Sequence, residues 1–351
     1  MKKINIGIIG SAGYTGGELI RLLINHPNAN IVFANSQSQA GKYIHQVHTD
    51  LLGDTDLKFS AETSEDIDVL FLCVGHGNAR KYLEANPVAD HIRVIDLSQD
   101  FRNDPELDLR GAATSAAATD TRSEAPLSTA SAGDRRHFIY GLPELNREII
   151  KTAKNIANPG CFATGIQLAL LPLAAGGLLN EHVHLTATTG STGAGQSPSA
   201  TTHFSWRNNN LSIYKPFGHQ HLKEITRSLN QLQPAFGAEL NLIPYRGAFS
   251  RGIIVSAYLN CELDETAARE LYESYYRDHV FTHVSPVNID LKQVVNTNKC
   301  ILYLEKHNGK LMIVSITDNL LKGASGQAVQ NMNLMFNLDE QTALRLKPAA
   351  F

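Results

Sequence analysis

The stretch NIANPGCFATG, residues 155–165, places a cysteine between a Pro-Gly turn and a run that is typical of a helix. Pro159 and Gly160 predict a sharp bend, and the helix is expected to begin at about Phe162. A thiol at a helix N-terminus lies at the positive end of the helix dipole, which favours the thiolate. We therefore expect Cys161 to have a lowered pKa and to act as a nucleophile. The alternative is a buried packing cysteine, which is the usual fate of a single cysteine.

A nucleophilic thiol needs a group that moves its proton, and two histidines precede a second helical pattern. They lie in YKPFGHQHLKEITRSLNQL, residues 214–232, where leucine and isoleucine repeat with helical spacing. Close to a helix N-terminus, His219 is expected to stay neutral and to serve as acid or base. An H-x-H pair also suits a metal ion, but no third ligand stands at a matching spacing, so no metal site is predicted.

Three glycines, Gly10, Gly13 and Gly16, lie between a short apolar run and a helical pattern. A strand, a glycine turn and a helix in this order let backbone N–H groups approach a pyrophosphate. The G-x-x-G-x-x-G spacing differs from the common G-x-G-x-x-G, and a simple packing turn is the alternative. The next strand is followed by ANSQSQAGK, without the acid that binds the ribose 2′-hydroxyl of NAD. The hydroxyl groups of Ser36 and Ser38 therefore favour NADP.

Two further loops carry groups that suit anions. TTGSTGAGQSP, residues 188–198, follows a predicted strand, and the backbone N–H groups around Ser191 and Gly193 can face an anion or an oxyanion. YRGAFSRG contributes Arg246 and Arg251, either of which can bind a carboxylate or a phosphate with two hydrogen bonds. An ordinary turn and solvated surface arginines are the simpler alternatives.

Two different scaffolds are expected to position these residues. In the first hundred residues, short apolar runs alternate with helical patterns, which predicts a doubly wound parallel α/β sheet of the Rossmann type. These runs cover 4–10, 30–35, 68–75 and 93–98. In the second half, β-branched runs predict a mixed or antiparallel sheet. They cover 182–190, 239–245, 252–263, 299–307 and 310–318. The stretch 111–135 is rich in Ala, Ser and Thr, so we expect a surface excursion there.

Charge and cysteine content exclude several classes of protein. A net charge of −3 without basic runs argues against a nucleic-acid partner. The four cysteines lie far apart and form no C-x-x-C pair, which fits reduced thiols in a cytoplasmic protein. No apolar stretch approaches the roughly 20 residues that span a bilayer, so no membrane partner is expected.

Taken together, the motifs resemble the N-acetyl-γ-glutamyl-phosphate reductase family of the semialdehyde dehydrogenase superfamily. The resemblance runs nearly from end to end of the chain. Its pieces are GSAGYTGGEL, VIDLSQDFR, FIYGLPELNRE, ANPGCFATG, GSTGAG, HQHLKEI, SRGI and DNLLKGASGQAVQNMNLM. Residues 36–38 read Ser-Gln-Ser where the family often has Ser-Arg-Ser.

The resemblance implies reduction of N-acetyl-γ-glutamyl phosphate by NADPH, through a cysteine thioester, to N-acetyl-L-glutamate 5-semialdehyde and inorganic phosphate in arginine biosynthesis. It implies an NADP-binding Rossmann domain over residues 1–160, completed by a C-terminal helix over 323–351. An α+β catalytic and dimerisation domain with a mixed sheet is implied over 161–322. The assembly is expected to be a homodimer or a homotetramer.

Site residues follow from the same resemblance, position by position. Cys161 matches the family nucleophile and His219 its acid or base. His221 and Arg251 match positions in the substrate site. The cofactor turn is expected to contain Ser11, Gly13, Tyr14, Thr15 and Gly16.

Other functions are compatible with some of these residues. The substrate of a reductase can be another acyl phosphate, such as aspartyl, aminoadipyl or N-succinyl-glutamyl phosphate. A thiol acyltransferase or hydrolase would use Cys161 and His219 without redox chemistry, and a regulator would only bind NADP. The strand–turn–helix pattern at Gly10 favours the reductase over both non-redox functions.

Overall fold

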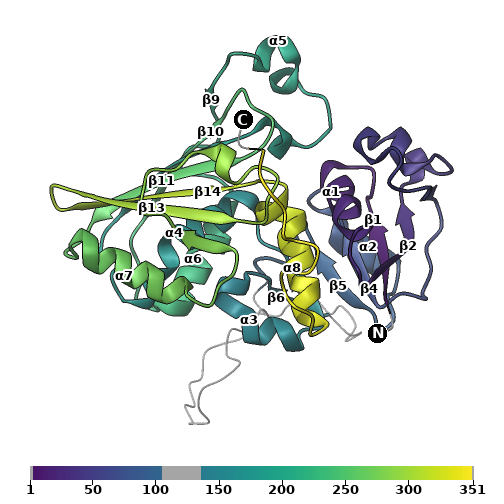
Figure 1. Ribbon diagram of the computed structural model, residues 1–351, viewed down its shortest axis with the longest axis horizontal. Helices are drawn as coiled ribbons and strands as arrows, with labels where there is room; N and C mark the ends of the chain where they lie inside the picture. Colours follow the sequence, from purple (N-terminus) through teal and green to yellow (C-terminus); the bar gives the residue numbers. More distant parts are fainter. Residues whose placement is uncertain (1–2, 105–135, 350–351) are drawn as a thin grey trace, which may run out of the picture.

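The computed structural model describes residues 3–104 and 136–349, so the stretch 111–135 lies outside the described residues. Within these ranges the chain forms two seven-stranded sheets (Figure 1). The first sheet is parallel throughout, with strand order β3-β2-β1-β4-β5-β7-β6. Its strands are β1 (Ile4–Ile9), β2 (Ala29–Asn35), β3 (Phe59–Ser60), β4 (Val69–Leu72), β5 (Arg93–Asp96), β6 (Ile139–Tyr140) and β7 (Asn155–Ala157).

This sheet confirms the predicted doubly wound architecture. Strands buried on both faces read as continuous apolar runs, and β4 is buried at all four positions. The chain order reverses between β1 and β4, and such a reversal opens a ligand crevice at the carboxyl ends of the strands. The helices on this side are α1 (Tyr14–Leu23), α2 (Asn78–Ala85), α3 (Pro143–Thr152) and α8 (Gly326–Met335). Short 3₁₀ turns are η1 (Gln37–Gln39), η2 (Ile44–Gln46) and η3 (Thr49–Leu51).

The C-terminal helix returns to the first sheet. It is preceded by a π-helical turn, η7 (Leu321–Ser325), and α8 packs beside α1 and α3 (Figure 1). Buried side chains of α8, including Val329 and Met332, share a core with Ile6 and Leu19. The predicted extent of 323–351 is wrong, because α8 covers ten residues only and Asn337 adopts the left-handed conformation that commonly follows a helix end.

The second sheet is mixed, with strand order β12-β13-β14-β11-β8-β10-β9. Its strands are β8 (Val183–Thr189), β9 (Ser212–Ile213), β10 (Leu240–Arg246), β11 (Ile253–Asn260), β12 (Thr282–Val284), β13 (Cys300–His307) and β14 (Lys310–Thr317). The pairs β8–β10 and β12–β13 are parallel and the other pairs antiparallel. Every predicted β-branched run is a strand here. The two- and three-residue strands β9 and β12 carried too short a pattern to be predicted.

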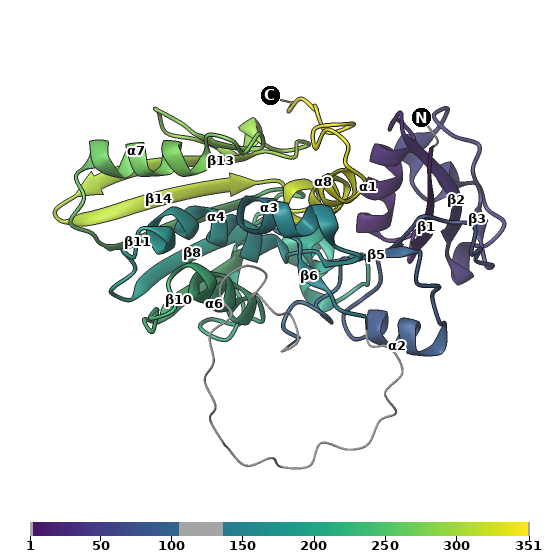
Figure 2. The ribbon, with the colours of Figure 1, turned by 90° about the horizontal axis from the view of Figure 1, so that it is seen from below.

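Three helices, α4 (Cys161–Ala175), α6 (His221–Leu232) and α7 (Glu265–Tyr276), cover one face of this sheet (Figure 2). The remaining helical segments on this side are α5 (Phe204–Arg207), η4 (Ser191–Ala194), η5 (Ala200–Thr202) and η6 (Leu291–Gln293). Apolar residues surround α4, as expected for a helix buried on all sides. Pro172 lacks the N–H that would bond the carbonyl of Leu168, and the Tyr276 hydroxyl donates to that carbonyl instead, at 2.6 Å.

The two sheets are joined directly through the cysteine turn. Strand β7 belongs to the first sheet, and after Asn158, Pro159 and Gly160 the chain enters α4, which packs on the second sheet. Cys161 is the first residue of α4. The thiol therefore lies at the junction between the cofactor-type sheet and the mixed sheet.

Candidate active site

The cysteine turn is closely packed on both sides. Gly160 caps α4, and Cys161 is partly exposed rather than buried like Cys73, Cys261 and Cys300. Gly323 of η7 approaches from the C-terminal segment, and a Cβ atom at this glycine would lie 2.9 Å from the Cβ atom of Cys161. Only glycine therefore lets η7 approach the thiol this closely.

The pKa of the thiol corrects one prediction. Burial raises the pKa of Cys161 to about 11, although Arg102 and the backbone N–H groups of Phe162 and Cys161 lower it. Glu224 also raises it. The lowered pKa predicted from the helix N-terminus is therefore wrong, because burial outweighs the helix dipole and Arg102 together.

The two histidines meet at the start of α6. His219 and His221 are 4% and 5% exposed, and their ring centroids lie 4.6 Å apart. The ring of Phe162, the residue after Cys161, makes a T-shaped contact with His219, with 5.3 Å between the ring centroids. Burial and Lys215 lower the pKa of His219 to about 4, so the ring is neutral as predicted.

A hydrogen bond fixes the tautomer of His219. Its Nδ1 accepts the backbone N–H of His221 at 3.2 Å, so the neutral ring carries its proton on Nε2. In this tautomer His219 offers a hydrogen-bond donor at Nε2. The ring can take up a further proton only at Nδ1, after the hydrogen bond from the His221 N–H has been given up.

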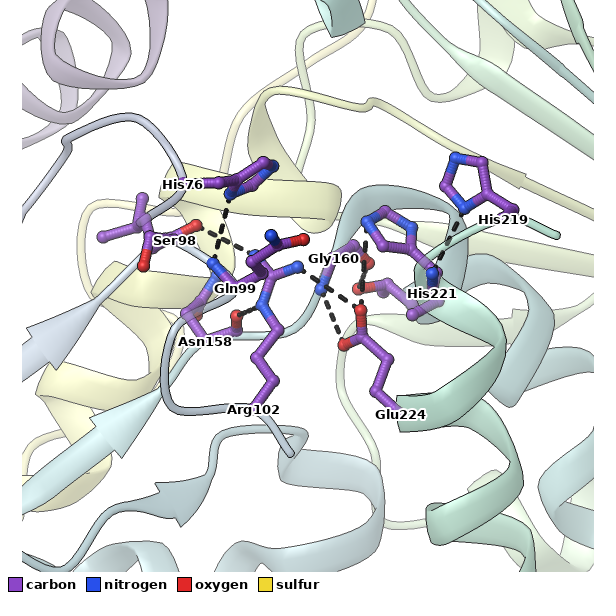
Figure 3. A network of polar contacts seen from close by, with 12 residues as sticks. His76, Ser98, Gln99, Arg102, Asn158, Gly160, His219, His221 and Glu224 are labelled. Carbon is purple, nitrogen blue, oxygen red and sulfur yellow. Dashed lines mark hydrogen bonds and ion pairs between the residues drawn. The ribbon is translucent and has the colours of Figure 1, made fainter. Parts of the chain in front are cut away.

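A buried acid links the histidines to the cysteine turn (Figure 3). Glu224, 2% exposed, accepts hydrogen bonds from the Tyr140 hydroxyl at 2.7 Å and from the N–H of Gly160 at 3.1 Å. Its other oxygen lies 3.3 Å from the Arg102 guanidinium and 3.8 Å from Nε2 of His221. The carboxylate thus holds the residue that precedes the nucleophile.

Arg102, in the segment that follows β5, completes this network. Its guanidinium donates to the carbonyls of Asn158 and Leu97 at 2.8 and 2.9 Å, and it is 3% exposed. A Cβ atom at Gly160 would lie 2.7 Å from Arg102 and 2.4 Å from His221. Together with burial, this cation lowers the pKa of His221 well below its usual value. Arg102 therefore places a positive charge beside the cysteine turn.

Sequence reasoning missed Arg102 and Glu224 as site residues, although both lie in the quoted motifs. One signal was available for Glu224. It stands three residues after His221 and next to Ile225, on the apolar side of an amphipathic helix, where an acid needs a buried partner. No local signal identifies Arg102, because its acidic partner is 122 residues away.

The glycine turn after β1 has the geometry of a dinucleotide cradle. Gly10 has φ +76°, and a Cβ atom there would lie 2.5 Å from the carbonyl of Cys73. A Cβ atom at Gly16 would lie 2.6 Å from the backbone of Ser11. A Cβ atom at Gly13, which caps α1, would meet only the carbonyl of Gly10, at 3.7 Å, and the N–H of Gly13 donates to that carbonyl at 3.3 Å. These residues fit a bound dinucleotide.

The other predicted cofactor residues surround this turn. The Ser11 hydroxyl donates to the carbonyl of Asn35 at 2.8 Å and thereby ties the turn to the end of β2. Ser36 follows β2 and is buried, whereas Ser38 in η1 is exposed. Tyr14 is 38% exposed at the start of α1. These positions line the carboxyl ends of β1 and β2, where the fold places a dinucleotide.

Two family profiles match the chain. One, described as "Semialdehyde dehydrogenase, NAD binding domain", covers residues 5–153. The other, described as "Semialdehyde dehydrogenase, dimerisation domain", covers residues 161–319. The break between them falls at the cysteine turn.

Full-length relatives decide the family. N-acetyl-gamma-glutamyl-phosphate reductases of Parabacteroides distasonis and Phocaeicola vulgatus are 53% and 54% identical to this chain over 349 residues, which is 99% of this chain and 100% of each relative. The chain belongs to the N-acetyl-γ-glutamyl-phosphate reductase family.

Solved structures extend this likeness to the fold of the superfamily. Aspartate semialdehyde dehydrogenase II of Vibrio cholerae, solved with ASA, superposes with a TM-score of 0.68 at 15% identity and covers 96% of this chain and 99% of its own. The aspartate semialdehyde dehydrogenase of Candida albicans, solved with NADP, has a TM-score of 0.63 at 14% identity, covering 95% and 99%. At these identities the likeness concerns the fold alone.

In this family member the loop over 188–198 does not offer the expected N–H groups. The N–H of Ser191 bonds the carbonyl of Phe249 at 2.8 Å, and that of Gly193 bonds the carbonyl of Gly190 at 3.2 Å. The loop is packed on the segment that precedes β11, so Ser191 and Gly193 are not supported as oxyanion donors. Backbone carbonyl groups of the protein accept the two N–H groups that the sequence predicts to be available to a ligand.

Arg251 is also placed differently from the prediction. Its guanidinium contacts Glu18 of α1 at 2.7 Å and Asp318 at 3.1 Å. With two carboxylates against it, the side chain is neutralised inside the protein. A role in binding substrate anions is therefore not supported for Arg251 in this reductase.

Among the residues over 3–104 and 136–349, no cluster of three His, Cys, Asp or Glu side chains is placed to hold a metal ion. No helix in these ranges is both long and apolar enough to cross a membrane.

Proposed function

We propose that this chain uses NADPH to reduce N-acetyl-γ-glutamyl phosphate to N-acetyl-L-glutamate 5-semialdehyde, with release of inorganic phosphate, in arginine biosynthesis. One observation carries the assignment of the nucleophile. Cys161 starts α4 at the junction of the two sheets, the next residue, Phe162, contacts His219, and Gly323 of η7 approaches the cysteine. The full-length relatives at 53% and 54% identity bear the name of this reaction.

In the first step the Cys161 thiol gives up its proton, which the departing phosphate takes up, and the resulting thiolate attacks the acyl carbon. A carbon–sulfur bond forms, the carbon–oxygen bond to the phosphate breaks, and the phosphate leaves with the bonding electrons. Arg102 and the N–H groups at the start of α4 stabilise the thiolate, because each of them lowers the thiol pKa. Glu224 keeps the turn in place through the N–H of Gly160. The product of this step is a thioester on Cys161.

The Gly10–Gly16 turn would hold NADPH, which would supply a hydride; a thioester accepts hydride more readily than a carboxylate does. We assign to His219 the hydrogen bond from Nε2 to the acyl oxygen, where negative charge develops in both tetrahedral species. The Nδ1 bond to His221 orients this donor. When the second tetrahedral species collapses, the Cys161 thiolate leaves again and the aldehyde is released.

Arg246 replaces Arg251 as the proposed ligand of a substrate anion. It ends β10, and its guanidinium lies 4.7 Å from the ring centroid of Tyr214. Tyr214 in turn packs 5.8 Å from His219 and 6.4 Å from Phe162. The Nε of Arg246 is buried and has no hydrogen-bond partner within the described residues. A cation with a buried donor, packed on the tyrosine that contacts His219 and Phe162, suits a carboxylate or a phosphate.

Arg246→Gln is expected to raise KM for the acyl phosphate, and to lower kcat/KM about 10- to 100-fold, because a charge-assisted hydrogen bond contributes roughly 1.5–3 kcal/mol. Steady-state kinetics with varied substrate measures the effect. Arg246→Lys is the matched variant and is expected to recover part of the loss, since it keeps the charge but not the planar donor pair. An unchanged KM in both variants would remove Arg246 from the site.

The assembly is expected to form through the second domain. The profile over 161–319 is described as a dimerisation domain. The helices α4, α6 and α7 cover one face of its sheet, and the segment around η6 covers only part of the other face. His184 and Tyr258 stack on that face, with 4.9 Å between ring centroids, and Tyr258 is 43% exposed. A second copy that packs there yields a homodimer, or a homotetramer through further contacts. We place the domain boundary at residue 160, with 323–351 joining the first domain.

The reverse reaction tests the function, because aldehydes are easier to handle than acyl phosphates. The purified protein is given N-acetylglutamate 5-semialdehyde, phosphate and NADP, and reduced cofactor is followed by absorbance. Phosphate-dependent reduction of NADP is expected. Parallel reactions contain NAD, N-succinylglutamate semialdehyde or aspartate semialdehyde, or lack phosphate. Activity with one of these aldehydes alone would reassign the substrate, and silence with all of them would favour a non-redox thiol enzyme.

A further inference from the structure

Arg251 forms an ion-pair cluster that crosses between the two domains. It lies in the turn between β10 and β11, whereas Glu18 lies on α1, the helix of the cofactor turn. The guanidinium contacts both oxygens of Glu18, at 2.7 and 3.2 Å, and both oxygens of Asp318, at 3.1 and 3.2 Å. We call these three residues, Glu18, Arg251 and Asp318, the clamp.

The clamp is shielded from solvent. Side-chain exposure is 20% for Arg251, 12% for Glu18 and 0% for Asp318. Burial raises the pKa of Glu18, but Arg251 and Arg21 more than offset this effect, so the pKa lies below its usual value and the carboxylate stays charged at neutral pH. Shielded bidentate contacts have a defined geometry, unlike solvated surface pairs.

On one side the clamp holds the turn that touches the nucleophile. Asp318 accepts the backbone N–H groups of Leu320 and Leu321 at 2.8 and 3.2 Å, and its carbonyl accepts the N–H of Gly323 at 2.9 Å. These bonds shape the start of η7. Gly323 of the same turn packs on Cys161. Hydrogen bonds and close packing therefore connect Asp318 to the surroundings of the thiol.

On the other side the clamp holds the cofactor turn. Glu18 lies one turn into α1, which starts at Tyr14, directly after the glycine cradle. A second link joins the same parts of the molecule, because the hydroxyl of Ser325, at the end of η7, donates to the carbonyl of Thr15 at 2.8 Å. The segment η7 thus contacts the cofactor turn at one end and Cys161 in its middle.

We propose that Arg251 is a positioning residue, which through Glu18 and Asp318 sets the distance between the cofactor turn and the Cys161 thioester for hydride transfer. This inference rests on the proposed function. It assigns to the arginine a different role from the substrate contact expected from the sequence. Hydride transfer is sensitive to such positioning, since a displacement of about 1 Å can cost roughly 100-fold in rate.

Glu18→Gln tests the proposal, with Arg21→Gln as the matched control. Arg21 binds the same carboxylate at 2.7 Å but from within α1, so its loss leaves the contact between the domains in place. Three quantities are measured in both variants: kcat with its deuterium isotope effect from NADPH labelled at C4, the rate of Cys161 alkylation, and hydrogen exchange of the amides in 14–23 and 320–326.

Glu18→Gln is expected to lower kcat about tenfold and to raise the isotope effect, because hydride transfer becomes slower than the other steps. Alkylation of Cys161 is expected not to fall, because loosening of η7 makes the thiol more accessible without removing any group that stabilises the thiolate. Amide exchange is expected to increase in both segments. Arg21→Gln is expected to match the wild type in kcat and in exchange over 320–326.

Two results would overturn the proposal: a Glu18→Gln variant with unchanged isotope effect and unchanged exchange over 320–326, or an equal loss of kcat in Arg21→Gln. A fall in alkylation rate that matches the fall in kcat would also do so, because it would indicate general disruption of the site. If the wild-type protein reduces none of the tested acyl groups, the proposed function fails, whereas the exchange measurement still decides whether the clamp couples the two segments.

Discussion

Cys161→Ser is expected to abolish turnover, with kcat at least about 10³-fold below that of the wild type. A serine hydroxyl at the start of α4 is a much weaker nucleophile than a thiol and has a much higher pKa. The ester that it would form is also a poorer hydride acceptor than a thioester. The measurement is the phosphate-dependent reduction of NADP in the reverse assay, together with intact-mass detection of the acyl adduct in the forward direction.

Cys261→Ser is the matched control for this variant. Cys261 is buried just after β11, away from the cysteine turn, and its replacement is expected to leave kcat within about twofold. A Cys161→Ser enzyme with more than a tenth of the wild-type rate, or an acyl adduct on another residue, would show that Cys161 is not the nucleophile.

The pH dependence of the thiol follows from its raised pKa. Because the thiolate is the reactive form and burial places the pKa at about 11, alkylation of Cys161 is expected to accelerate about tenfold per pH unit up to that value. A plateau near pH 7 would instead indicate the low-pKa thiol predicted from the sequence. Bound substrate would change the charges that surround the thiol, including the influence of Glu224, and would shift the dependence of the alkylation rate on pH. The rate is therefore measured in the free enzyme.

The nucleophile and the cofactor turn could be predicted because their signals are local. A Pro-Gly turn before a helix and a glycine turn after an apolar strand each lie within about ten residues. The two sheets could also be predicted from local signals, because each longer strand has its own pattern of apolar residues. The thiol pKa could not be predicted from this local signal, since it depends on burial by η7, which arrives from residues 321–325.

Arg251 and Arg246 show what the sequence leaves undetermined. Both stand in one eight-residue motif, and either suits an anion. Arg251 meets Glu18 across 233 residues and Asp318 across 67 residues, whereas Arg246 keeps a buried Nε without a partner among the described residues. The choice between them depends on tertiary contacts. The loop over 188–198 also differs from its prediction because of tertiary contacts. The carbonyl groups of Phe249 and Ser250, which are distant in the sequence, accept N–H groups of this loop.

His219→Asn is expected to lower kcat by about 10²- to 10³-fold, the range for loss of one oxyanion donor. Its Oδ1 can replace Nδ1 as acceptor of the His221 N–H, while the Nε2 donor is lost. His219→Gln is the complementary variant, because its amide places a donor near the position of Nε2, and it is expected to recover part of the loss. Kinetics of both variants separate the Nε2 donor from the Nδ1 acceptor, and activity within about threefold of the wild type in both would remove His219 from the reaction.

The same ring gives a stability test that does not depend on turnover. Burial and Lys215 lower the folded-state pKa of His219 to about 4, below the value of about 6.5 for an unfolded chain. Between these values the unfolded chain binds more protons than the folded one, so this group destabilises the fold as the pH falls from about 6.5 towards 4. His219→Gln removes that contribution, and its Tm is expected to fall less steeply than the wild-type Tm over this window. Parallel Tm profiles in the two proteins would mean that His219 titrates normally and is not buried as a neutral ring.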